Sequence, residues 1–130
     1  MTSVEQNVVF SVSDEKYCVA KLPPDAEVPS ICSKSFYSVT KTEEEISLVC
    51  LESLAPVGAD IVRNWRGIKV QGPLEFSLKG VLVSLLSPLA EANIAVFAVS
   101  TYNTDYLFVK QKDLPKAIEA LETVGHRLTA

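Results

Sequence analysis

The second half of the chain switches repeatedly between the hydrophobic period of a β-strand and that of an α-helix. Residues 68–76 read as a strand, and from Val81 to Ala92 apolar side chains recur at helical spacing. Residues 94–101 are apolar on both alternating faces, which predicts a central, covered strand. A hairpin, a second helix after Asp113 and a short final strand complete the series. The order strand, helix, strand, strand, helix, strand predicts a ferredoxin-like βαββαβ unit in the α+β class.

The first half of the chain repeats part of this pattern. Residues 36–40 are predicted to pair with residues 46–51 in a hairpin, and an offset of 60 residues places this hairpin on the later one. Residues 55–64 are interpreted as a helix of the earlier unit. We therefore predict two ferredoxin-like units, residues 1–65 and residues 66–130, of which the N-terminal unit is less regular.

Charge and apolar patterning limit the kinds of partner. The sequence has 12 basic and 16 acidic residues, and its net charge of -4 provides no overall positive field for nucleic acid. No apolar stretch reaches the about 20 residues that a membrane span needs. The first residues also lack the basic and apolar regions of a signal peptide. We therefore expect a cytoplasmic protein that contacts neither nucleic acid nor membrane.

The three cysteines, Cys18, Cys32 and Cys50, are odd in number and widely spaced. Their spacing fits neither a disulfide framework nor the paired ligands of a zinc site. We expect reduced thiols, with Cys18 and Cys50 acting as small apolar side chains within strands. No metal site and no cofactor is predicted.

The predicted connectivity brings two separate segments to one edge of the C-terminal unit. In a βαββαβ unit the first helix begins at the edge to which the second strand returns, so the loop at residues 77–80 lies near the hairpin turn at residues 102–105. The loop offers the unpaired N–H groups and positive dipole end of a helix, which attract a carboxylate. Asp105 in the hairpin can pair with an ammonium group. A free amino acid carries both groups, so we predict a site for a small amino acid or a related carboxylate.

The predicted ligand-binding residues come from the loop and the hairpin together. They are Ser77, Leu78, Lys79, Gly80, Val81, Ser100, Thr101, Asn103, Thr104 and Asp105. Simpler interpretations stay open beside this one. Asp105 belongs to a common class of turn formers, and Gly80 can serve only to ease a tight strand-to-helix turn. Lys79 can attract a carboxylate or remain a solvated side chain.

Other residue patterns do not indicate catalysis. His126 is the one histidine of the sequence, and it follows a helix-stopping glycine, so we expect it at the surface or at a sheet edge rather than in a catalytic triad. The three glutamates at residues 43–45 predict a solvated turn rather than a metal site. Tyr106 and Phe108 alternate like the exposed rings of an RNA-recognition domain. The basic and glycine residues of that motif are missing, so covered core rings are expected.

Several segments of the second half resemble ACT domains. They are Leu78-Lys79-Gly80-Val81-Leu82, Ser87-Pro88-Leu89-Ala90-Glu91-Ala92-Asn93-Ile94, Ser100-Thr101-Tyr102-Asn103-Thr104-Asp105-Tyr106 and Val109-Lys110. The resemblance is strongest to small tandem-ACT proteins and to the eukaryotic cytosolic arginine sensor family. It implies a regulatory, non-catalytic module that binds an amino acid at an interface between ACT units, with Gly80 and Asp105 at ligand-binding positions. It also implies a homodimer.

The leading hypothesis is therefore an amino-acid sensor that signals by changing contacts between units or subunits. A ligand shifts such an equilibrium only if it binds one arrangement more tightly than the other. The alternative is a structural or assembly module with a vestigial pocket, in which ACT-like sheets pair between chains. A small-molecule enzyme is a third and weaker hypothesis.

Overall fold

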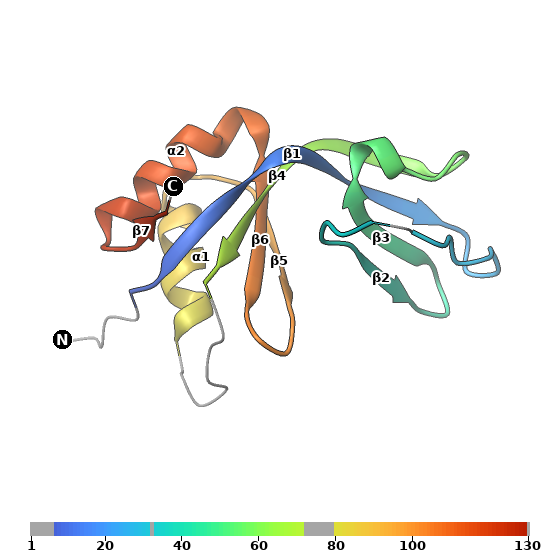
Figure 1. The fold of residues 1–130 in the computed structure, drawn as a ribbon, viewed down its shortest axis with the longest axis horizontal. Coiled ribbons are helices and arrows are strands. Elements are labelled where there is room, and N and C mark those ends of the chain that lie inside the picture. The colour runs from blue at the N-terminus through green and yellow to red at the C-terminus, as the bar shows by residue number, and fades with distance from the viewer. Residues whose placement is uncertain (1–6, 32, 72–79, 130) are drawn as a thin grey trace. The chain divides into compact units, whose positions relative to one another are not determined.

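The computed structural model describes residues 7–31, 33–71 and 80–129, and Figure 1 shows its helices and strands. In these ranges the chain contains two α-helices, two short 3-10 helices and a set of mostly antiparallel strands. This confirms the predicted α+β class. Within the same ranges, no helix is long and apolar enough to cross a membrane.

The chain divides into two compact units. Unit 1 consists of Met1–Asp14 and Arg66–Ala130, and unit 2 consists of Glu15–Trp65. Two strands, β1 (Val9–Leu22) and β4 (Asp60–Val70), contribute residues to both units. The beginning of β1 is therefore part of the unit that the C-terminal half forms. The division into domains 1–65 and 66–130 stays a prediction.

Unit 1 follows the order of elements predicted for the second half. After β4 come α1 (Val81–Glu91), β5 (Val96–Ser100), β6 (Asp105–Lys110), the 3-10 helix η2 (Gln111–Asp113), α2 (Leu114–Thr123) and β7 (Arg127–Leu128). Its strands lie in the order β7-β1-β4-β6-β5. β5 and β6 are antiparallel, with Ser100 opposite Asp105 at the turn, whereas β7 is parallel to β1.

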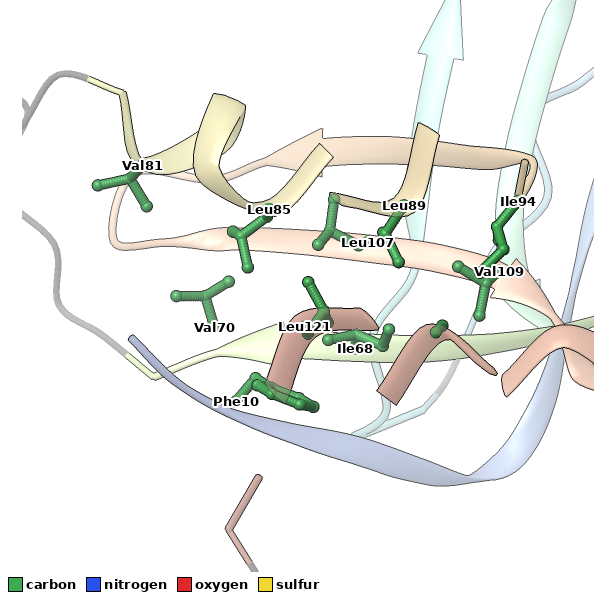
Figure 2. Close-up of a cluster of buried hydrophobic side chains, with 11 residues drawn as sticks. Phe10, Ile68, Val70, Val81, Leu85, Leu89, Ile94, Leu107, Val109 and Leu121 are labelled. Atoms are coloured by element: carbon green, nitrogen blue, oxygen red, sulfur yellow. The ribbon is translucent and has the colours of Figure 1, made fainter. Parts of the chain in front are cut away.

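Both helices of unit 1 pack on one face of its sheet. Alternate residues of a strand share a face, and on β4 and β6 these are buried aliphatic side chains. The cluster consists of Phe10, Ile68, Val70, Val81, Leu85, Leu89, Ile94, Leu107, Val109, Ala117 and Leu121, most of them labelled in Figure 2. The three α1 residues are four positions apart, which confirms the predicted apolar stripe. Burial of each large side chain contributes about 1.5–3 kcal/mol, so this layer stabilises the unit.

Helix α1 begins and ends at residues with positive φ. Gly80, its N-cap, has a φ of 83°, and Asn93, just after its C-cap, has a φ of 63°. The N–H of Ile94 donates to the carbonyl of Leu89 at 3.0 Å, as in a left-handed C-terminal cap. Pro88 lies inside the helix, which continues past it to Glu91. The left-handed Gly80 sets where α1 begins, and this beginning of the helix is part of the predicted site.

The prediction of a central, covered strand at residues 94–101 is wrong, because β5 is the last strand of the sheet. Ala95, Ala98 and Ser100 are exposed. β6, between β4 and β5, is the covered strand of this hairpin, and its Leu107 and Val109 are fully buried. Apolar residues on both faces of a strand thus do not guarantee that both of its neighbours are present.

The predicted helix at residues 55–64 is also wrong. The chain makes only the 3-10 helix η1 (Glu52–Leu54) and then enters β4 at residue 60. Pro56 cannot donate a backbone hydrogen bond, and Gly58 has a φ of 85°, so both interrupt a helix. The β-branched residues that follow Gly58 favour a strand. In its described residues unit 2 therefore lacks an α-helix, and its agreement with the ferredoxin-like plan is incomplete.

Besides the first part of β4, the sheet of unit 2 contains the second part of β1, β2 (Ser38–Lys41) and β3 (Ile46–Leu51). The strands lie in the order β2-β3-β1, and both pairs are antiparallel. The predicted hairpin of residues 36–40 with residues 46–51 is confirmed. The core of unit 2 lies along β1 and β3, where Ala20, Ile46 and Leu48 are fully buried.

Cys18 and Cys50 face each other across β1 and β3. Their Sγ atoms are 3.9 Å apart, and both are buried free thiols, as predicted. Burial, with a smaller contribution from Cys50, raises the pKa of Cys18 to about 12. Burial raises the pKa of Cys50 as well. Both therefore act as small apolar residues at neutral pH. Cys32 lies outside the described residues.

The hairpins of the two units are built alike. Each has a four-residue loop that opens with a threonine, Thr42 in unit 2 and Thr101 in unit 1. The N–H of each threonine donates to the carbonyl three residues on, at 2.9 Å and 2.8 Å respectively. Each Oγ1 accepts from the N–H of that same residue at 3.2 Å. The two loops are related by 59 residues, so the predicted offset of 60 is wrong by one.

Candidate functional site

The start of α1 and the turn between β5 and β6 lie at the same end of unit 1, as Figure 1 and Figure 2 show. Thr104 Oγ1 donates to the backbone carbonyl of Val70 at 2.6 Å, which attaches the turn to the end of β4. Val70 and Val81 belong to the same buried cluster, so the first turn of α1 packs near that strand end. Gly80 and Asp105 thus belong to segments that share one end of the unit. Of the predicted residues, Ser77, Leu78 and Lys79 lie outside the described ranges.

The N-terminus of α1 has no side-chain cap. Gly80 is exposed, and no described side chain makes a capping hydrogen bond there. The first N–H groups of a helix have no partner within it, and the helix dipole adds about half a positive charge at this end. This backbone can therefore attract a carboxylate. Val81 contributes only its backbone, because its side chain is in the core.

Asp105 is the first residue of β6 and lies beside the turn. Ser100 Oγ donates to Asp105 Oδ1 at 2.5 Å, across the strand pair that closes the loop. The turn itself is held by Thr101 and Thr104, and the bond between Ser100 and Asp105 joins the two strands at its base. The interpretation of Asp105 as a residue that stabilises the turn therefore stays open beside its predicted role in binding. The carboxylate is half-buried and fixed in position. Its second oxygen is the group that could accept a hydrogen bond from a ligand ammonium.

Some polar side chains of the turn hold its structure, and others are exposed to solvent. Thr104 is buried, and its hydroxyl serves the bond to Val70, so it is not available to a ligand. Thr101 Oγ1 donates to the carbonyl of Thr104 at 3.1 Å. Asn103 is exposed at the tip. Sequence reasoning left out Tyr102, which is 82% exposed beside Asn103. Its place inside a short hairpin loop is the sequence feature that predicts its exposure.

His126 corrects the expectation of a surface or edge histidine, because it is only 2% exposed. The N–H of Val8 donates to its Nδ1 at 3.1 Å, and its Nε2 lies 2.9 Å from the carbonyl of Ser84 in α1. Because Nδ1 accepts, the ring proton is on Nε2 and donates to Ser84. Gly125, with a φ of 107°, turns the chain so that His126 points inward. His126 therefore joins the residue before β1 to α1, and both of its ring nitrogens pair with backbone groups.

The remaining expectations on side chains have mixed outcomes. Phe108 is a covered core ring, 1% exposed and stacked on Phe97 at 4.9 Å. Tyr106 is only half-buried, with Lys69 Nζ at 6.0 Å from its ring centre. The glutamates at residues 43–45 lie in a turn, as predicted, although Glu45 is half-buried. Among the described residues, no group of three His, Cys, Asp or Glu side chains could hold a metal ion.

Comparison with known families agrees with this fold. Residues 60–123 match the family model of the ACT domain, and residues 15–57 match a model that describes an N-terminal domain. ACT domains have the α+β arrangement that unit 1 shows. The chain belongs to the ACT-domain proteins.

Two individual relatives are similar to most of this chain. Protein Atu0741 of Agrobacterium tumefaciens, whose crystal structure is known, is 32% identical, with 96% of this chain and 94% of that chain covered at a TM-score of 0.89. Human cytosolic arginine sensor for mTORC1 subunit 1 is 28% identical over 102 residues. That match covers 72% of this chain and 31% of the sensor, so this chain spans about a third of the relative.

The fold also occurs in an aspartokinase. E. coli aspartokinase III, solved in complex with aspartate and ADP, is 10% identical, with 94% of this chain and 35% of that chain covered at a TM-score of 0.63. At this identity the likeness shows the fold alone.

Proposed function

We propose that this protein is a cytoplasmic, non-catalytic regulatory module that binds a small amino acid or a related carboxylate. The ligand carboxylate binds the uncapped N-terminus of α1 at Gly80, and the ligand ammonium binds Asp105. The binding of this ligand changes contacts between ACT units or between two copies of the chain. Binding at an interface between ACT units is the arrangement that the resemblance to the family predicts.

The observation that carries this proposal is the position of Asp105. Its carboxylate is held by Ser100 beside the turn, and Thr104 fixes that turn to the strand end from which the chain leads to Gly80. A negative side chain and a positive helix end therefore share one end of unit 1. The two poles of an amino acid are complementary to such a pair.

The relatives support the same class of function. The human relative is named as a cytosolic arginine sensor, and its match covers 72% of this chain. We infer from that name an amino-acid ligand for this chain, without assigning which one. A regulatory module of this kind acts by binding its ligand more tightly in one arrangement than in the other and needs no chemical step.

Thermal-shift screening with the twenty common amino acids tests the proposal. A ligand that binds the folded state raises the midpoint by mass action, and at 100 times its Kd the gain is about 2.7 kcal/mol. We expect at least one amino acid to stabilise the protein and Asp105→Ala to remove that effect. A hit that stabilises Asp105→Ala equally would show that Asp105 is outside the site.

A second candidate function is an assembly module in which the pocket is vestigial. The observation in its favour is the edge strand β5, Val96–Ser100, which contains neither a charged residue nor a proline. Edge strands usually carry such residues to prevent pairing with another chain. A homodimer that forms through this edge, together with no response to any amino acid, would favour assembly. Sedimentation of wild type and Ala98→Lys measures this directly, because the lysine adds a charge to β5.

A further inference from the structure

A hollow in unit 2 lies apart from the residues proposed to bind the ligand in unit 1. It is lined by Pro24, Asp25, Lys41, Thr42 and Glu43, and its volume is about 620 Å³. Small-molecule sites usually bury most of their ligand, whereas this hollow is shallow and wide open, so its charged groups would have to hold a ligand. It is open to solvent, between the chain that follows β1 and the β2–β3 hairpin, two segments that Figure 1 shows at the same end of unit 2.

Lys41 supplies a fixed positive group in this hollow. It is the last residue of β2, and its Nζ donates to the carbonyl of Pro24 at 2.8 Å. An ammonium group has three donors, so this bond leaves two of them for other acceptors. The carbonyl is neutral, so the bond positions the lysine without cancelling its charge. Pro24 is itself held in a turn, where the N–H of Ala26 donates to the carbonyl of Pro23 at 3.1 Å.

Two carboxylates complete the polar lining. Asp25 and Glu43 come from opposite sides of the hollow, one from the turn after β1 and the other from the hairpin loop. A simple anion would face both carboxylates, and a simple cation would face Lys41. A molecule with a carboxylate and an ammonium satisfies both signs of charge at once. The hydroxyl of Thr42 is engaged in its own turn and adds little.

The likeness of the two hairpins gives this arrangement a counterpart. At the corresponding positions, Lys41 stands where unit 1 has Ser100, and the buried Ile46 stands where unit 1 has Asp105. The described part of unit 2 has no α-helix whose N-terminus could receive a carboxylate. A lysine side chain therefore supplies the positive group that backbone supplies in unit 1.

We propose that this hollow is a second binding site, for a zwitterionic small molecule of the free amino-acid class. The ligand carboxylate bonds Lys41 Nζ, and its ammonium group lies between Asp25 and Glu43. The proposal rests on residues of unit 2 alone, so it does not depend on ligand binding at Asp105. Because the charged groups are exposed, we expect weak binding, with a Kd of about 1 mM.

Amide chemical shifts, followed by NMR during titration, test this site. The probes are each of the twenty common amino acids, with acetate and methylammonium as ligands that carry one pole only. We expect at least one amino acid to shift the amides of residues 41–43, and each single-pole probe to shift them much less. Lys41→Gln should weaken that binding about tenfold or more, since it removes a charge-assisted contact. Lys34→Gln, a matched change at another exposed lysine of unit 2, should leave it unchanged.

Asp105→Asn separates this proposal from that of unit 1. It should leave the shifts of residues 41–43 intact, whereas Lys41→Gln should leave any response near Gly80 and Asp105 intact. No shift at residues 41–43 with any amino acid at about 10 mM would overturn the second site. Equal shifts with acetate and with the amino acid would overturn the zwitterionic ligand. Loss of the shifts in Lys34→Gln would overturn the role of Lys41.

Discussion

Replacement of His126 should destabilise unit 1 by an amount that the structure allows to be calculated. In His126→Phe a ring of similar shape remains, but the N–H of Val8 and the carbonyl of Ser84 both lose their partner. The loss of its hydrogen bond costs a buried polar group about 1–3 kcal/mol, so the two lost bonds should cost about 2–6 kcal/mol. Domains of ordinary size have a free energy of unfolding of about 5–15 kcal/mol, so this loss is large. His126→Gln, which can both accept and donate, should lose about half as much.

Urea unfolding followed by far-ultraviolet circular dichroism measures this effect. With a slope of about 1–3 kcal/mol per molar urea, the midpoint of His126→Phe should fall by about 1–2 M. Arg127→Gln is the matched control, because it changes the next residue, which is exposed and begins β7, and its midpoint should not move. A His126→Phe midpoint equal to that of wild type would refute the reasoning that His126 joins the residue before β1 to α1.

Three further predictions concern single residues of the fold. Gly80→Ala places a side chain at a φ of 83° and should cost about 1–2 kcal/mol, seen as a lower thermal midpoint; a midpoint that rises would contradict the left-handed N-cap. Thr104→Val removes the bond to Val70 and should cost about 1–3 kcal/mol, with faster hydrogen exchange in the β5–β6 turn; unchanged exchange would count against that bond. Burial raises the pKa of Cys18 from 9.0 to about 12, so above pH 9 the unfolded thiol loses a proton that the folded one keeps. Stability is therefore complete below pH 9 and falls toward pH 12, and urea midpoints should fall less steeply over this range in Cys18→Ala; parallel curves would contradict the shift.

Much of unit 1 could be predicted from the sequence, because its elements carry regular and local signals. The α1 stripe at Val81, Leu85 and Leu89 and the turn signals between β5 and β6 each act within a few residues, and the structure has both. The position of the α1 start beside the turn follows from connectivity alone. Binding of a ligand by Gly80 and Asp105 stays a prediction, because it depends on the chemistry of the ligand as well as on the fold.

The errors arose where long-range contacts decide the outcome. The apolar run of β5 has the composition of a covered strand, but among the described residues a strand pairs with it on one side only. The segment after Gly58 has few strong helix signals, and pairing along the sheet makes it part of β4. The burial of His126 depends on partners 118 and 42 residues away, so no local pattern could reveal it.

Calorimetric titration tests the amino-acid site of unit 1 most directly. The amino acid with the largest thermal shift should bind wild type, and Asp105→Asn should bind it about tenfold more weakly or worse, since it removes the charge but keeps an acceptor for Ser100. Asp14→Asn, an equal charge change at an exposed residue of unit 1, should bind like wild type. Equal affinity of Asp105→Asn and wild type would contradict the assignment of the ligand ammonium to Asp105.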